Sequence, residues 1–184
     1  MARQPRTATR ARRAKRTPAI AFDAITLEGG LIAPAMLTQI ARIEADEQTA
    51  NDYGIARGLI LRDEIARAYR IAQAHYADLT AHPEPSLAAT QRFTEALLRD
   101  VLEFRDLVPV GRHDRDGDIY PVTFEGLGGR VPVVVVPPAD GIDRVSASMT
   151  AAGRRGSAAS VVQDWLNADD AALWGLACCE TTQA

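Results

Sequence analysis

Val131-Pro132-Val133-Val134-Val135-Val136 is apolar at every position and predicts a strand whose two faces are both buried. Such a central strand needs covering elements on both faces and paired strands along both edges. Pro132 has no backbone N–H, so it is expected at the start of the strand, where one donor can be spared. We therefore expect the second half of the chain to fold around this strand.

Shorter elements surround the central strand. The stretches 107–110 and 119–124 predict two further strands, separated by the charged, turn-rich segment 111–117. The glycine-rich stretch 126–129 leads into a strand, so it predicts a hairpin turn, whereas a dinucleotide or methyl-donor site needs such a turn between a strand and a helix. Residues 137–156 are polar and predict a loop.

A helix and a strand are expected after this loop. The buried face of the helix consists of Val161, Val162, Trp165 and Leu166. Ser157 or Ser160 is expected to cap its start, and Ser160 with Gln163 matches a capping box. The apolar stretch 173–179 predicts a final strand.

The first half of the chain has a helical pattern. Pro34 opens a helix that runs to about Glu47, and 51–54 is a turn signal. The clearest element is a long second helix with one apolar stripe, formed by Leu61, Ile65, Tyr69, Ala72, Tyr76 and Leu79. This stripe predicts packing on a neighbouring helix, and the alternative is a face that binds a partner. Residues 90–102 predict a third helix after the proline-rich break at 81–86.

Together these elements predict an α/β (α+β) fold in three parts. A disordered basic tail is expected at 1–19, a helical arm at 20–81, and a small α/β domain with a mixed sheet and flanking helices at 82–184. No apolar run approaches the roughly 20 residues that a membrane span needs. The neighbouring Cys178 and Cys179 cannot form a disulfide framework. We therefore expect a soluble cytoplasmic protein without a membrane partner.

Charge is divided sharply along the chain. The first sixteen residues contain no acid and seven basic residues, namely Arg3, Arg6, Arg10, Arg12, Arg13, Lys15 and Arg16. The remaining residues contain 14 basic and 24 acidic side chains, a balance of −10. Such a tail is expected to be disordered and to bind DNA weakly, without sequence preference, through phosphates. Two alternatives remain open: a solvated terminus without a partner, and an organelle transit peptide of similar composition.

Common catalytic motifs are missing. Three histidines are scattered along the chain: His75, His82 and His113. No Cys/His spacing fits zinc, and no G-x-S-x-G motif occurs. The alternation of Asp114, Asp116 and Asp118 suggests a calcium loop, but Ile119 stands at the sixth position where glycine is needed, so a charged hairpin turn is favoured. We expect no catalytic residue, no metal ligand and no cofactor in this chain.

One arrangement is similar to the pattern of restriction nucleases, in which carboxylates on two neighbouring strands hold a metal and a lysine positions water. The chain has a helix at 90–102, acids at Asp118 and Glu125, and a hydrophobic strand at 131–136. Proline, proline and alanine at 137–139 stand where the pattern has Glu-x-Lys, and none of these side chains binds a metal. The prediction is a degenerate nuclease-like core, with an active metal-dependent nuclease as the weakest alternative.

Several short stretches occur in a fixed order within residues 20–177. They are Gly29-Gly30-Leu31-Ile32-Ala33-Pro34, Asp52-Tyr53-Gly54, Asp63-Glu64-Ile65-Ala66-Arg67-Ala68, the proline-headed strand near Val131, Gly141-Ile142-Asp143-Arg144, Val162-Gln163-Asp164-Trp165-Leu166-Asn167 and Leu173-Trp174-Gly175-Leu176. As an ordered series they resemble the amino-terminal region of large bacterial type IIG-like restriction–modification adenine DNA methyltransferases, including those of phage-defence systems.

The resemblance implies a role without transferase activity. The methyl-donor site and the Asn-Pro-Pro-Tyr-type motif of that family lie well downstream of this region, and nothing in the chain matches either. The leading hypothesis is therefore a non-catalytic amino-terminal module, truncated before the transferase domain, that contacts DNA or docks a transferase polypeptide encoded downstream. The main alternative is a free-standing protein-interaction module without a nucleic-acid role, using the apolar face of the second helix.

Overall fold

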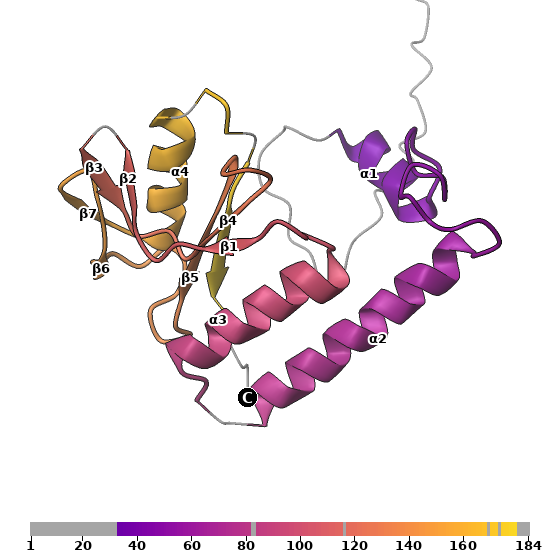
Figure 1. Cartoon of the computed structure of the whole chain (residues 1–184), viewed down its shortest axis with the longest axis horizontal. Helices are drawn as coiled ribbons and strands as arrows, with labels where there is room; N and C mark the ends of the chain where they lie inside the picture. The colour runs from indigo at the N-terminus through magenta and orange to yellow at the C-terminus, as the bar shows by residue number, and fades with distance from the viewer. Residues whose placement is uncertain (1–32, 82–83, 116, 169, 173, 180–184) are drawn as a thin grey trace, which may run out of the picture. The chain divides into compact units, whose positions relative to one another are not determined.

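The computed structural model describes residues 33–81, 84–115, 117–168, 170–172 and 174–179. It has the predicted α+β fold, with helices and mixed sheets (Figure 1). Its contacts divide the chain into two compact units between Leu61 and Arg62. In the described part of the chain, no helix combines the length and the apolar character that crossing a membrane requires.

The main sheet has the strand order β1-β4-β5-β8. Its members are β1 at Val108–Pro109, β4 at Phe124–Gly126, β5 at Val131–Val136 and β8 at Leu176–Cys179. β4 pairs antiparallel with both β1 and β5, whereas β8 runs parallel to β5. The sheet is therefore mixed, as predicted, and β5 is an inner strand.

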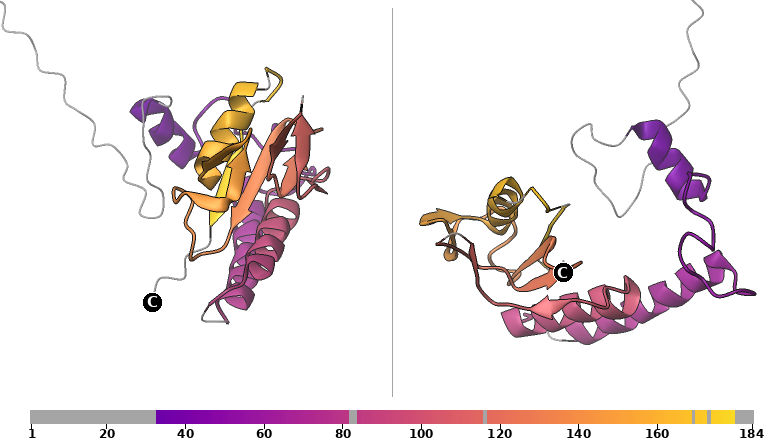
Figure 2. Two further views of the ribbon diagram at one scale, coloured as in Figure 1. Left: turned by 90° about the vertical axis from the view of Figure 1, so that its left-hand side faces the viewer. Right: turned by 45° about the horizontal axis from the view of Figure 1, so that its top comes forward.

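Helices are described in both units. They are α1 at Pro34–Arg42, α2 at Leu61–Thr80, α3 at Leu87–Ala96 with the π-helical turn η1 at Leu97–Val101 continuing it, and α4 at Ala158–Ala168. The helix that opens at Pro34 is confirmed, but it ends at Arg42, because Ile43 adopts a left-handed conformation. In the second unit, α3 and α4 cover opposite faces of the main sheet (Figure 2).

All six residues of β5 are buried, and the two cores explain why. Val134 and Val136 belong to the cluster formed with α4, whereas Val133 and Val135 belong to the cluster beneath α3 and η1. Alternate side chains of a strand point to opposite faces, so a strand covered by helices on both sides must be apolar throughout. The prediction of a central strand with Pro132 near its start is confirmed.

Two small hairpins accompany the sheet. The first pairs β2 at His113–Arg115 with β3 at Asp118–Tyr120, and the second pairs β6 at Ser146–Ala151 with β7 at Arg154–Gly156. The single strand predicted at 119–124 is wrong: the chain leaves β3 at Pro121 and enters the main sheet only with β4. A loop throughout 137–156 is also wrong, because β6 places Met149 and Ala151 in the core.

The start of α4 corrects the predicted capping box. The backbone N–H of Ser157 donates to Oγ of Ser160 at 2.8 Å, and the N–H of Ser160 donates to Oγ of Ser157 at 3.2 Å. Gln163 donates instead to Oδ1 of Asn167 at 3.1 Å. The helix begins one turn earlier than a box of Ser160 and Gln163 requires, so the reciprocal pair is Ser157 with Ser160.

The second half of α2 packs against α3. The rings of Tyr76 and Phe93 meet edge to face with centroids 6.0 Å apart, and Nε2 of His75 lies 3.0 Å from Oδ2 of Asp100 in η1. These contacts place α2 in the same unit as the sheet, whereas the sequence placed the boundary after residue 81.

Candidate functional site

The acids of the predicted nuclease-like core belong to different sheets. Asp118 begins β3, whereas Glu125 is the middle residue of β4. The register pairs Glu125 with Pro132 near the start of β5, while residues 137–139 follow the other end of that strand. From Pro132 to Val136 a strand extends about 13 Å, at roughly 3.3 Å per residue. The positions that such a nuclease brings together are thus spread over two sheets and two ends of one strand.

Glu125 has a partner in the β2–β3 hairpin. Its Oε1 contacts Nδ1 of His113, and the two side chains are 14% and 30% exposed. This contact joins the β2–β3 hairpin to the main sheet. It also gives His113 as a partner to the carboxylate of Glu125, which would be a metal ligand in a nuclease of this pattern. In the ranges that the structure describes, no group of three or more His, Cys, Asp and Glu side chains is arranged to hold a metal ion.

Trp165 of α4 is fully buried and contacts three side chains of the β2–β3 hairpin. The ring of His113 meets it edge-on at 4.6 Å between centroids, and the ring of Tyr120 does so at 5.4 Å. The guanidinium carbon of Arg115 lies 4.3 Å from the centre of the indole, within the range of a cation–π interaction. The hairpin is thus fixed to α4 by one aromatic residue.

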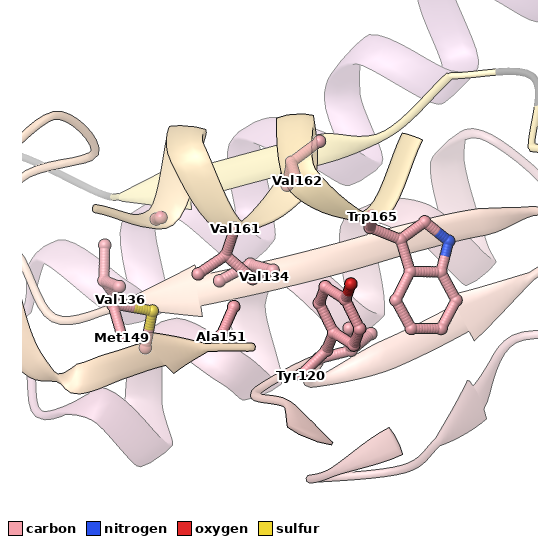
Figure 3. Packing of buried hydrophobic residues seen from close by; sticks show 10 residues of the cluster. Tyr120, Val134, Val136, Met149, Ala151, Val161, Val162 and Trp165 are labelled. Carbon is pink, nitrogen blue, oxygen red and sulfur yellow. The ribbon is translucent and has the colours of Figure 1, made fainter. Parts of the chain in front are cut away.

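Tyr120 contributes a neutral phenol to this cluster (Figure 3). Burial, with smaller contributions from the carboxylates of Asp118 and Asp164, raises the pKa of Tyr120, so its hydroxyl stays protonated. Within the described residues, the buried Nε1 of Trp165 has no hydrogen-bond partner. His113, Arg115 and Tyr120 each contact the indole of Trp165, so this cluster packs the hairpin against α4.

Two turns predicted from the sequence are confirmed. The turn that leads into β5 is held by Asp106, whose Oδ2 accepts from the N–H of Gly128 at 2.8 Å. This hydrogen bond, with a second from the N–H of Leu127, holds the pKa of Asp106 below its usual value. In the β2–β3 hairpin, Oδ1 of Asp114 accepts from the N–H of Gly117 at 3.1 Å, which is the behaviour of a charged turn.

The apolar stripe of α2 has two different surroundings. Leu79 is buried and Tyr76 contacts Phe93, but Ile65 and Tyr69 are 50% and 63% exposed. The prediction that the whole stripe packs on a neighbouring helix is therefore wrong for its first half. The physical reason is length, since α3 and η1 together have fewer residues than α2 and meet only its second half.

The predicted DNA-binding residues form one group in the sequence, from Arg3 to Arg16. They lie outside the described residues. The sequence reasoning missed the contacts of His113 and Arg115 with Trp165. Their alternation around Asp114 is a weak strand signal, and three residues are too few to separate it from a turn.

Comparisons of the chain with protein-family models, with curated proteins and with solved structures gave no match.

Proposed function

We propose that this chain is a non-catalytic module that associates with DNA and acts beside a restriction–modification methyltransferase polypeptide. The observation that carries the proposal is the division of charge. Seven basic residues and no acid precede residue 17, in front of a body with a balance of −10. Arginine and lysine on a chain segment neutralise phosphates and release counterions, which gives affinity without sequence recognition. The net negative charge of the body makes the tail the main segment for DNA contact.

The arrangement of the acidic residues supports the non-catalytic part of the proposal. The carboxylate of Glu125 is engaged by His113, and Asp118 belongs to a separate hairpin. After β5 the chain continues with Pro137 and Pro138, whose carbonyl oxygens lie 3.7 Å from Sγ of Cys179. The side chains of Pro137 and Pro138 offer neither a ligand for a metal nor a group that positions water.

A measurement of DNA affinity against salt concentration tests the proposal. The full chain should bind duplex DNA with a logarithmic salt slope of about −0.9 for each phosphate neutralised, up to about −6 if all seven basic residues engage. A chain without residues 2–16 should lose most of this affinity and slope. Replacement of the seven basic residues by glutamine, at unchanged length, is the matched control for the loss of chain. Unchanged affinity after either change would contradict the role of the tail.

A second function, as a protein-interaction module, is favoured by one specific observation. Ile65 and Tyr69 present half or more of their surface to solvent on the same face of α2. If the chain is a protein-interaction module without a nucleic-acid role, the full chain should show no measurable affinity for DNA at any salt concentration. The same titration therefore separates the two functions.

A further inference from the structure

The segment that contains the β6–β7 hairpin is the longest acid-free basic stretch of the described chain. Residues 144–163 contain Arg144, Arg154 and Arg155 and no aspartate or glutamate. The body as a whole has a balance of −10, so this stretch departs from its surroundings. We refer to β6 and β7, residues 146–156, as the basic ribbon.

The ribbon has one buried face and one exposed face. Met149 and Ala151 are buried, whereas Ser148 and Thr150 are exposed. Thr150 lies directly opposite Arg155 in the register, so the two side chains share the outer face. Hydroxyl and guanidinium groups therefore occur together on the surface of the ribbon.

A hollow of about 420 Å³ lies between the ribbon and the β2–β3 hairpin. Ser148, Thr150 and Gly153 line it from the ribbon, and Arg112 and Asp118 line it from the other hairpin. β3 and β6 are in contact, so both walls belong to one unit (Figure 1). The hollow is polar, and one arginine and one aspartate face it together.

Two arginines of this surface have no ion pair within the described ranges. Arg112 and Arg155 are exposed and make no salt bridge there. Arg154, in contrast, lies 3.4 Å from a carboxylate oxygen of Asp164, and Arg115 lies over the ring of Trp165. Within the described residues, Arg112 and Arg155 can therefore bind a new anion without breaking a salt bridge. The same holds for Arg144, which precedes the ribbon and donates to the carbonyl oxygen of Ala139 at 3.2 Å.

We propose that the basic ribbon with Arg112 is a second phosphate-binding surface, which takes the backbone of duplex DNA. Guanidinium and hydroxyl groups are the side-chain donors that bind phosphate oxygens, and a two-stranded ribbon is narrow enough to approach a groove of DNA. The inference rests on the proposed function, because it assumes that the chain associates with DNA. It adds orientation, since a rigid hairpin held to the core fixes the body relative to the duplex.

The test compares full-length variants in the same duplex titration over a series of salt concentrations. Replacing Arg112 and Arg155 by glutamine should reduce the magnitude of the salt slope by about 2, since each lost phosphate contact removes about 0.9. At a salt concentration of about 0.1 M this corresponds to an affinity loss on the order of tenfold or more. Arg62→Gln with Arg92→Gln removes the same charge from α2 and α3 and is the matched control. Lysine at positions 112 and 155 should retain most of the slope.

Asp118 provides a change of opposite sign. Its carboxylate repels phosphate at the hollow, so Asp118→Asn should increase affinity for the duplex. Weaker binding by Asp118→Asn would indicate a bridging cation and overturn the proposal.

Equal losses in the ribbon variant and the matched control would overturn it too. If the unchanged full chain binds no duplex, the proposed function fails. If it binds and only the tail matters, the proposed function stands and the ribbon surface is wrong.

Discussion

At the scale of single residues, Trp165 connects elements that are distant in the sequence. It belongs to α4, yet its ring contacts His113, Arg115 and Tyr120 from the β2–β3 hairpin. His113 in turn contacts Glu125 in the main sheet. One indole therefore secures a hairpin that has only three residues in each strand and no large core of its own.

Trp165→Ala should lower the free energy of unfolding by about 3–5 kcal/mol, because it leaves a cavity and removes the contacts of the hairpin. Trp174→Ala is the control: this second tryptophan is 40% exposed and should cost much less. Denaturant titration of both variants measures the difference. Each variant retains one tryptophan, so fluorescence also reports the environments separately. Similar losses in the two variants would contradict the central role of Trp165.

At the scale of elements, long periodic segments could be predicted and short ones could not. The stripe of α2, the face of α4 and the apolar run of β5 each repeat a pattern over enough residues to be recognised. β2 and β7 have three residues each, too few to repeat a pattern, and each pairs with the neighbouring strand of its own hairpin. The same limit applies to the candidate surface, because Ser148 and Thr150 alternate with Met149 and Ala151 over only four residues, and a loop was predicted there.

The start of α4 gives a prediction at this scale. Ser157→Ala should destabilise the protein by about 1 kcal/mol, because Oγ of Ser157 accepts from the N–H of Ser160. Gln163→Ala tests the capping box expected from the sequence and should have little effect, as the exposed side chain of Gln163 donates to Oδ1 of Asn167. Thermal melts of the two variants decide between these positions. A larger loss for Gln163→Ala would restore the box of Ser160 and Gln163.

At the scale of the whole molecule, the separation of the acids determines what we expect of catalysis. Asp118 and Glu125 lie in different sheets, and the end of β5 offers proline at 137 and 138. Purified chain with magnesium or manganese should therefore leave plasmid DNA intact over hours, as followed by gel electrophoresis. Cleavage that Asp118→Asn abolishes would establish a metal-dependent nuclease and contradict the non-catalytic proposal. Arg62→Gln is the control for a contaminating nuclease, since it leaves both acids in place.

The parallel pairing of β5 with β8 also has a consequence for biosynthesis. Val136 is made 40 residues before Leu176, the first residue of its partner strand. At a translation rate of about 5–20 residues per second, the synthesis of β8 begins roughly 2–8 s after that of β5 is complete. During that time a strand of five valines and one proline lacks one neighbour and the covering helix α4. Pro132 lacks a backbone N–H and so interrupts the hydrogen-bonding edge of β5, and the charged Arg130 lies just before this strand. A proline and a flanking charge both disfavour the pairing of an exposed apolar strand with another nascent chain.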